Sequence, residues 1–211
     1  MNSIMDNSIF KFIFPIILGY LFGCIQTSYF LGKFKFGVDV KSQGSKNAGA
    51  SNSVLLFGWK FGIFVGFIDM LKSYIPMFII FSIYSQDSLF LASLAGGGAI
   101  LGHTFPFFMN FNGGKGMSCY FGMLMGLDFL FGIVVFIIGG LLVMLTNYVA
   151  ASTILVLITV PFILYFLCDV SNLNLIISIS FFSCIIFIKH IENIRKIYKG
   201  TETTFWSVMK K

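Results

Sequence analysis

Long runs of apolar residues alternate along this chain with short segments that are rich in glycine, lysine and asparagine. The runs cover residues 9–31, 54–84, 88–102, 116–127, 129–146, 150–168 and 172–188. A helix needs about 20 residues, with a range of about 17–25, to cross a bilayer, and a lipid-facing helix lacks the apolar stripe of a soluble one. The pattern therefore predicts an all-α fold, a polytopic membrane protein with about seven transmembrane helices.

Some of these runs do not have the length of one straight crossing. Runs 88–102 and 116–127 are short, and a re-entrant short run would lower the count to about five or six. Run 54–84 is long and contains Pro76. Because proline lacks a backbone donor and clashes with the preceding turn, we expect the helix to break or kink near Ser73–Ile75.

The composition excludes a soluble fold. Of the 211 residues, 57% are hydrophobic and only 10% are charged, whereas a soluble domain carries about 25% charged residues. A single integral membrane domain over residues 1–211, surrounded by membrane lipid, is enough to account for the chain.

The basic residues define a predicted sidedness. The net charge is +6, but most of the lysines and arginines lie in the segments between apolar runs, which favours positive-inside topology and not a nucleic-acid partner. The basic segments are 33–46, Lys115 and the tail from Lys189. With all three in the cytoplasm, the N-terminus lies outside and the C-terminus is cytoplasmic.

A first polar cluster, G-S-K-N-A-G-A-S-N at 44–52, directly precedes an apolar run. Glycine lets backbone N–H groups approach a ligand, and the N-terminus of the following helix favours an anion. Serine and asparagine are also ordinary helix-capping residues. The cluster alone is consistent with a ligand loop and with a capped turn.

A second cluster joins G-H-T-F-P at 102–106 to N-G-G-K-G at 112–116. Glycine N–H groups, the charge of Lys115 and a helix that starts at once are the parts of an anion-binding nest. The spacing is not that of a Walker A loop, and Met117 stands where that loop has Ser or Thr. The cluster therefore favours a phosphate ligand over ATP.

A third cluster reads H-I-E-N-I-R at 190–195, with G-T-E at 200–202. If the last helix continues past its apolar run, His190 and Asn193 share one face, although His190 could instead anchor the helix at the interface. The histidines have no matched carboxylate at ligand spacing, so we expect no metal site and no cofactor.

One pair of ionisable residues, Asp69 and Lys72, lies inside an apolar run. Ionisable residues at membrane depth face the protein interior and are functional candidates. A charge pair that fixes helix packing is an equally good interpretation of this spacing.

Together, the clusters resemble the acyl-phosphate-dependent glycerol-3-phosphate acyltransferases of bacterial membranes, the PlsY-type family. The family motifs are G-S-G-N-x-G-A-T-N, then G-H-x-F-P-x-F with F-K-G-G-K-G, then H-x-E-N-I-x-R with G-T-E. This chain has matching segments, in the same order, at 44–52, 102–108, 111–116, 190–196 and 200–202. The resemblance covers nearly the whole chain.

The resemblance implies that an acyl chain passes from acyl-phosphate to glycerol-3-phosphate, giving lysophosphatidic acid and phosphate in the first step of phospholipid synthesis, without a metal. It also implies a multi-pass protein of the bacterial inner (plasma) membrane, with the active site facing the cytoplasm. The catalytic residues that it implies are Ser45, Lys115, Thr153, His190 and Asn193. The substrate-binding residues that it implies are Asn47, Gly49, Asn52, Gly113, Gly114 and Gly116, and we add Lys46 as a departure from the family pattern that could supply a charge to the same loop.

The chain departs from the family pattern at several positions. Leu55 replaces an arginine whose bidentate phosphate contacts lysine reproduces poorly. Lys46 replaces the second glycine of the first motif and could return a charge to that loop, Gln26 replaces the proline of an early G-S-I-P, and Asn112 replaces a lysine. A diverged paralogue with altered or no activity is therefore one alternative.

Two rival functions remain to be weighed. A small-anion transporter would place polar residues through the centres of the spans, whereas the clusters of this chain gather at one predicted face. An acyltransferase that uses acyl-CoA or acyl-carrier protein would carry H-x-x-x-x-D. That motif is absent, because Phe108 and Arg195 occupy the positions of the aspartate.

We expect residues 33–52, 103–116 and 189–211 to face the cytoplasm, because they carry the basic residues. Cysteines introduced at positions 42 and 199 should be protected from a membrane-impermeant maleimide in intact cells. Labelling of either position from outside would contradict the predicted topology.

Overall fold

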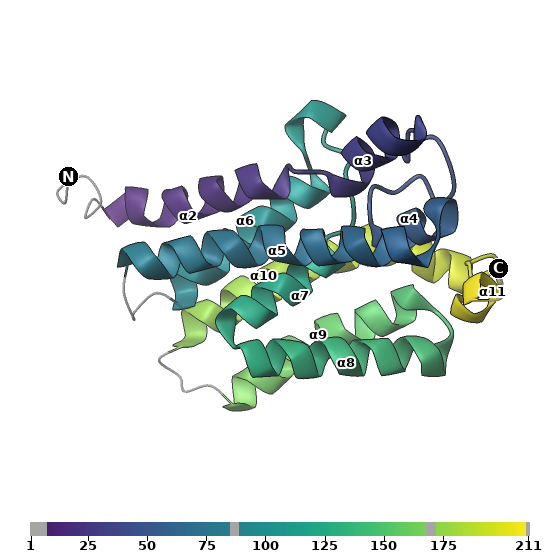
Figure 1. Ribbon diagram of the computed structural model, residues 1–211. Helices are drawn as coiled ribbons and strands as arrows, with labels where there is room; N and C mark the ends of the chain where they lie inside the picture. The colour runs from purple at the N-terminus through teal and green to yellow at the C-terminus, as the bar shows by residue number, and fades with distance from the viewer. Residues whose placement is uncertain (1–7, 85–88, 168–171, 210–211) are drawn as a thin grey trace. The chain divides into compact units, whose positions relative to one another are not determined.

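The computed structural model describes residues 8–84, 89–167 and 172–209, and every element in those ranges is helical (Figure 1). The elements are α2 (Ser8–Gly23), α3 (Thr27–Phe36), α4 (Ala50–Phe57), α5 (Trp59–Tyr84), α6 (Leu89–Thr104), the 3-10 helix η2 (Phe107–Met109), α7 (Met117–Leu127), α8 (Phe129–Thr146), α9 (Val149–Leu167), α10 (Leu173–Tyr198) and α11 (Phe205–Met209). The predicted all-α class is confirmed.

Six helical stretches in the described part of the chain are long and apolar enough to cross a membrane. They are Ile9–Phe36, Trp59–Tyr84, Leu89–Met109, Phe129–Thr146, Val149–Phe166 and Leu173–Tyr198. The one predicted run that is not among these six, 116–127, corresponds to α7. Its 11 residues extend only about 16 Å at 1.5 Å per residue. The polytopic class is thus supported, and the count of seven and the orientation of the termini stay predictions.

A break near Ser73–Ile75 is wrong, and the alternative, a kink there, stays a prediction. Helix α5 continues through Pro76 to Tyr84, and the long apolar run is divided at Gly58 instead. Gly58 has a φ of 86°, and its N–H donates to the carbonyl oxygen of Val54, which ends α4. A residue with positive φ ends a helix readily, whereas proline inside a membrane helix is tolerated when neighbouring groups satisfy the backbone.

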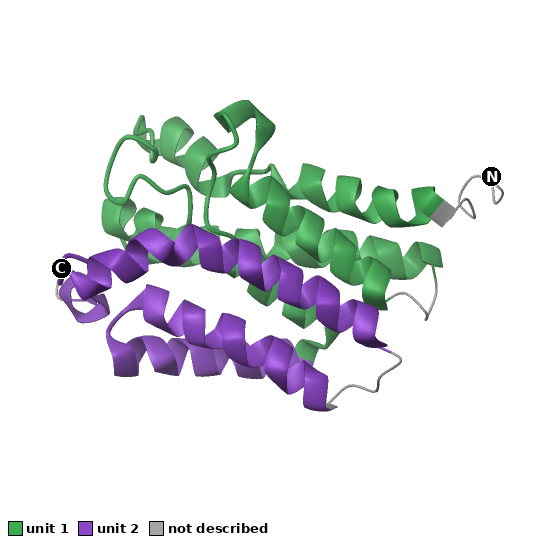
Figure 2. Ribbon diagram, turned by 180° about the vertical axis from the view of Figure 1, so that it is seen from behind, with its two compact units in different colours: residues 1–129 green, residues 130–211 purple. Residues whose placement is uncertain are grey.

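The chain divides into two compact units, Met1–Phe129 (unit 1) and Leu130–Lys211 (unit 2), coloured green and purple in Figure 2. Unit 1 contains α2 to α7, and unit 2 contains α8 to α11 apart from Phe129. Each unit is described by itself below, and the single domain predicted over 1–211 stays a prediction.

In unit 1, α2 and α6 pack with their backbones in direct contact. Gly19 and Gly23 lie on the face of α2 that meets α6, and Gly98 and Gly102 lie on the facing side of α6. A Cβ atom at any of these four positions would collide with a backbone carbonyl of the opposite helix. Pairs of small residues spaced by four let membrane helices approach this closely.

The close packing determines what lies at the end of α6. Helix α2 ends at Gly23, and the connection from α2 to α3 lies against the last turn of α6. From α2 itself, Tyr20 Oη donates a hydrogen bond to the carbonyl oxygen of Phe105 at 2.9 Å. Helix α5 packs against α2, α6 and α7. The end of α6 that carries His103 is therefore enclosed by several elements of unit 1.

In unit 2, the C-terminal segment folds back onto the turn between α8 and α9. Hydrogen bonds from Gly200 and Thr201 to the carbonyls of Ile197 and Lys196 end α10. The backbone N–H groups of Phe205 and Trp206 then donate to Asn147, at 2.8 Å to its carbonyl oxygen and 2.9 Å to its Oδ1.

We expect Gly98→Ala to destabilise the protein, because its methyl group would meet the backbone of Ile16, which cannot rotate away as a side chain can. Overpacking of this kind costs about 1–3 kcal/mol. Thermal unfolding in detergent should show a lower midpoint for this variant. Gly140→Ala is the matched control, because no atom lies within 4 Å of its added Cβ, and an equal effect of both substitutions would contradict the packing argument.

Candidate functional site

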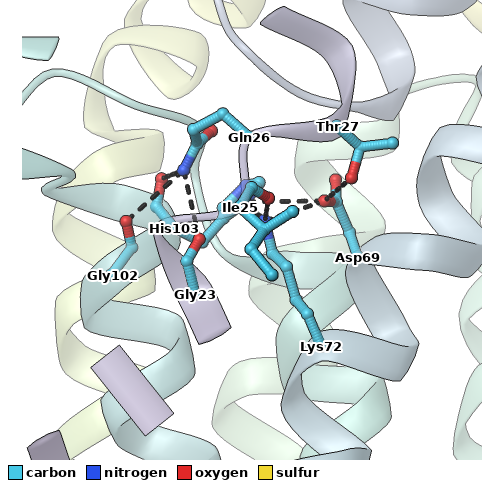
Figure 3. Close-up of polar contacts among 8 residues, drawn as sticks. All are labelled: Gly23, Ile25, Gln26, Thr27, Asp69, Lys72, Gly102 and His103. Carbon is cyan, nitrogen blue, oxygen red and sulfur yellow. Dashed lines mark hydrogen bonds and ion pairs between the residues drawn. The ribbon is translucent and has the colours of Figure 1, made fainter. Parts of the chain in front are cut away.

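A buried network of polar side chains lies in unit 1 at the end of α6 (Figure 3). The ammonium of Lys72 is 2.8 Å from Asp69 Oδ1, 2.8 Å from the carbonyl oxygen of Ile25 and 2.7 Å from His103 Nδ1. The side chains of Lys72 and Asp69 are only 3% and 2% exposed. An ammonium has three donors, so each of the three has an acceptor here.

Gln26 joins the same region through its backbone contacts. Its Nε2 lies 3.3 Å from the carbonyl oxygen of Gly23, 3.4 Å from that of Gly102 and 3.0 Å from that of His103. The last carbonyls of a helix have no partner within the helix. From the connection that follows α2, Gln26 therefore donates hydrogen bonds to carbonyl oxygens at the ends of both α2 and α6.

The glycine loop after α6 packs directly on His103. The N–H of Gly113 donates to the carbonyl oxygen of Thr104 at 3.0 Å, and that of Gly114 donates to the carbonyl oxygen of His103 at 2.9 Å. A Cβ at Gly114 would collide with His103 Nε2 and would lie 2.8 Å from the carbonyl oxygen of Ala48. At Gly114 the imidazole occupies the space of a side chain, and at Gly113 the carbonyl oxygen of His103 and the ring of Pro106 occupy it.

This geometry corrects the expected anion nest. The expectation of exposed N–H donors at Gly113 and Gly114 is wrong, because both groups already donate to carbonyls of the chain. Gly116 precedes the first turn of α7, and Lys115 is half-buried beside it. The binding roles assigned to Gly113, Gly114, Lys115 and Gly116 stay predictions.

The first polar cluster is organised by Asn52. This buried side chain accepts from the N–H of Ser45 at 2.7 Å and donates to the carbonyls of Val40 and Gln43 at 2.9 Å and 3.2 Å. A Cβ at Gly44, whose φ is 60°, would collide with Asn52 Oδ1. Asn52 thus fixes the loop, and its role in substrate binding stays a prediction.

The loop that Asn52 fixes presents the other residues of the cluster. Ser45 and Lys46 are exposed, Asn47 is half-buried, and Gly49 is buried in extended backbone before α4. Lys46 has a φ of 57°, a left-handed conformation that costs a non-glycine residue roughly 1–2 kcal/mol. The glycine of the family pattern at this position would avoid that cost.

The two loops of unit 1 lie at one end of the unit, where α3 ends and α4 begins (Figure 1). Lys41 Nζ donates to Asn112 Oδ1 at 3.0 Å, and the carbonyl oxygen of Ala48 lies close to Gly114. The structure therefore brings the first and second clusters together, beside the buried network.

The third cluster lies on α10 in unit 2, and that helix is continuous through residue 198. His190 is buried, and its Nδ1 lies 2.8 Å from the carbonyl oxygen of Ile186. Asn193 Nδ2 donates to Glu202 Oε1 at 2.7 Å, so the G-T-E segment folds back on the helix. Thr153 is buried in the first turns of α9.

The sequence assignment of site residues omitted four members of the buried network. Asp69 and Lys72 were expected to be either functional or a packing pair, His103 was only part of the second polar cluster, and Gln26 was only a departure from a pattern. The available signal was their position, since polar side chains inside apolar runs need partners and tend to find one another. Among the residues that the structure describes, no group of three or more His, Cys, Asp or Glu side chains could hold a metal ion.

Comparisons with known proteins identify the family of this arrangement. Residues 13–200 match the model of the family described as glycerol-3-phosphate acyltransferase. The chain is 34% identical to glycerol-3-phosphate acyltransferase 1 of Oceanobacillus iheyensis, over 95% of this chain and 98% of that protein. It is 35% identical to glycerol-3-phosphate acyltransferase 2 of Thermotoga maritima, over 90% and 94%.

Solved structures give the same result. The chain is similar to a crystal structure of PlsY, an integral membrane glycerol 3-phosphate acyltransferase, in its glycerol 3-phosphate form. The TM-score is 0.84 at 30% identity, over 92% of this chain and 96% of that one. The lysophosphatidic acid form of PlsY also gives 0.84, at 28% identity over 95% and 100%. The resemblance seen in the motifs is confirmed.

Because Gly114 packs against His103 and Ala48, we expect Gly114→Ala to destabilise unit 1 by about 1–3 kcal/mol, since the methyl group has no space. Thermal unfolding in detergent should show the loss. Gly66→Ala is the control, because its Cβ would lie an ordinary 3.4 Å from Ala50 Cβ and 3.9 Å from Ser118 Oγ. If the Gly114→Ala protein is as stable as the wild type, the packing argument is wrong, and the loop has only the predicted ligand-binding role.

Proposed function

This chain belongs to the glycerol-3-phosphate acyltransferase family, and from that premise we propose that it transfers an acyl chain from acyl-phosphate to glycerol-3-phosphate. The products are lysophosphatidic acid and inorganic phosphate. The observation that carries the proposal is the meeting of segments 44–52 and 102–116 at one end of unit 1, since both match family motifs and are separated in the sequence by residues 53–101.

The reaction places modest demands on the protein. Acyl-phosphate is a mixed anhydride, and its phosphate is a good leaving group. The oxygen of the glycerol hydroxyl forms a bond to the acyl carbon, the bond from that carbon to the phosphate oxygen breaks, and the hydroxyl proton is taken up. Positioning of the two substrates and stabilisation of the phosphate charges supply most of the rate.

Several side chains of unit 1 have the chemistry for those tasks. Lys115 follows the glycine loop and supplies a positive charge for a phosphate beside the start of α7, where the helix dipole also favours an anion. Ser45 and Asn47 supply a hydroxyl and an amide from the loop that Asn52 fixes. We assign Gly49, Gly113 and Gly116 to the shape of these loops.

In unit 2, His190 has the protonation pattern of a proton acceptor. A carbonyl oxygen only accepts, so His190 Nδ1 carries the hydrogen that it donates to Ile186. The lone pair of the neutral ring therefore lies on Nε2, the atom that would take up the hydroxyl proton. Asn193 lies one turn further along α10, oriented by Glu202, and Thr153 contributes a hydroxyl from α9.

A diverged activity is the second candidate, because of one position. Leu55, on α4, is 38% exposed and replaces the arginine of the family pattern. We propose that Lys46 supplies the missing charge, since it belongs to the first polar cluster, which precedes α4 in the chain, and its side chain is exposed. The active site faces the cytoplasm of a bacterial inner membrane, where both substrates are anions in reach of these lysines.

An assay with purified protein tests the proposal. Palmitoyl-phosphate with glycerol-3-phosphate should give phosphate and lysophosphatidic acid in equal amounts, and palmitoyl-CoA should not replace palmitoyl-phosphate. Lys46→Ala should lower the rate roughly ten- to a hundred-fold, the loss expected for one charge-assisted hydrogen bond, and Leu55→Arg in that background should restore part of it.

The outcomes separate the candidates. A wild-type protein that is inactive, but is activated by Leu55→Arg, would indicate a diverged paralogue. Wild-type kinetics in Lys46→Ala would remove the compensating role of that lysine and leave the acyltransferase proposal in place. Product from palmitoyl-CoA alone would contradict the acyl-phosphate donor.

A further inference from the structure

The buried lysine determines which nitrogen of His103 carries the hydrogen. His103 Nδ1 lies 2.7 Å from the ammonium nitrogen of Lys72, and that ammonium is held by the carboxylate of Asp69. An ammonium donates and never accepts, so Nδ1 must accept. In the neutral imidazole the hydrogen is then on Nε2. Nε2 is therefore a hydrogen-bond donor.

That donor faces the glycine loop. A Cβ at Gly114 would collide with Nε2 and would lie 2.7 Å from Cε1 of the same ring. Ala48, from the first polar cluster, borders the same space, since its carbonyl oxygen lies 2.8 Å from that Cβ. Nε2 thus points to the place where the two family motifs of unit 1 meet.

No protein acceptor for this hydrogen is present in the described ranges of the chain, although His103 is only 3% exposed. A donor that the protein does not use is available to water or to a ligand. The neighbouring N–H groups of Gly113 and Gly114 are already used. Of these three N–H groups, the Nε2–H of His103 is the one that can donate to a ligand.

We propose that His103 is a substrate-binding residue whose Nε2–H donates a hydrogen bond to a phosphate oxygen of the substrate, and that Lys72 is the residue that positions it. The proposal rests on the proposed function, in which both substrates carry a phosphate. A neutral donor binds that oxygen without adding a charge of its own, and Lys72 maintains the tautomer because its ammonium occupies Nδ1.

Two substitutions separate this role from a purely structural one. His103→Asn keeps an acceptor near the position of Nδ1 for Lys72 and removes the donor at Nε2. His103→Gln places an amide N–H near the position of Nε2 and removes the acceptor for Lys72. If His103 served only to satisfy Lys72, the asparagine variant would be the active one.

We expect the opposite order with palmitoyl-phosphate and glycerol-3-phosphate. His103→Asn should lose roughly ten- to a hundred-fold in kcat/KM, and His103→Gln should retain several-fold more activity than His103→Asn. A raised KM for glycerol-3-phosphate would show that His103 contacts the phosphate of glycerol-3-phosphate. A raised KM for palmitoyl-phosphate would show that it contacts the phosphate of palmitoyl-phosphate. Wild-type kinetics in His103→Asn, or equal losses in both variants, would overturn the proposal.

A second measurement uses the wild-type protein and does not depend on activity or on the folding of a variant. The chain has only two histidines, so a nitrogen-15 spectrum of histidine-labelled protein in detergent contains two rings. His103 should be the Nε2–H tautomer and His190 the Nδ1–H tautomer, and the His103→Asn spectrum assigns them.

Addition of glycerol-3-phosphate or palmitoyl-phosphate should shift the Nε2 signal of His103. An Nδ1–H tautomer at His103, or an Nε2 signal that neither compound moves, would overturn the proposal. If the enzyme assay shows no transfer while the signal shifts with phosphate compounds, the proposed reaction fails and the binding role of His103 stands.

Discussion

One buried ammonium organises unit 1. Lys72 bonds at once to a carboxylate on its own helix, to the backbone between α2 and α3, and to the imidazole at the end of α6. An ammonium inside a membrane protein is costly unless all its donors have partners. Because those partners come from three elements, a shift of any one element would leave a donor of the buried ammonium without its acceptor. This constraint fixes the arrangement of the site.

The glycines of α2 and α6 make that ammonium's position possible. Only backbones in contact bring the carbonyl of Ile25 and the ring of His103 within reach of one lysine side chain. Gln26 completes the junction by donating to carbonyls at the ends of both helices. The polar network around Lys72 therefore depends on the close packing of α2 against α6.

The sequence predicted the helical membrane class and the family, because these depend on local composition and on motif order. It did not predict where the long apolar run divides. Proline was expected to be the breaking residue, but α5 continues through Pro76, and Gly58, with its positive φ, divides the run instead. It also misjudged the Gly113 and Gly114 N–H groups, because their acceptors lie on α6, and no local pattern reveals a partner that only tertiary packing supplies. The network of Gln26, Asp69, Lys72 and His103 escaped assignment for the same reason.

The contact between α2 and α6 also has a consequence for the surrounding lipid. Where carbonyl oxygens of one helix occupy the space that a methyl group on the other would need, no hydrocarbon tail can slide between the two. That seam is closed to lateral diffusion from the bilayer along the glycine-lined part of both helices. A hydrocarbon chain that approaches unit 1 from within the membrane is therefore excluded from this contact between α2 and α6.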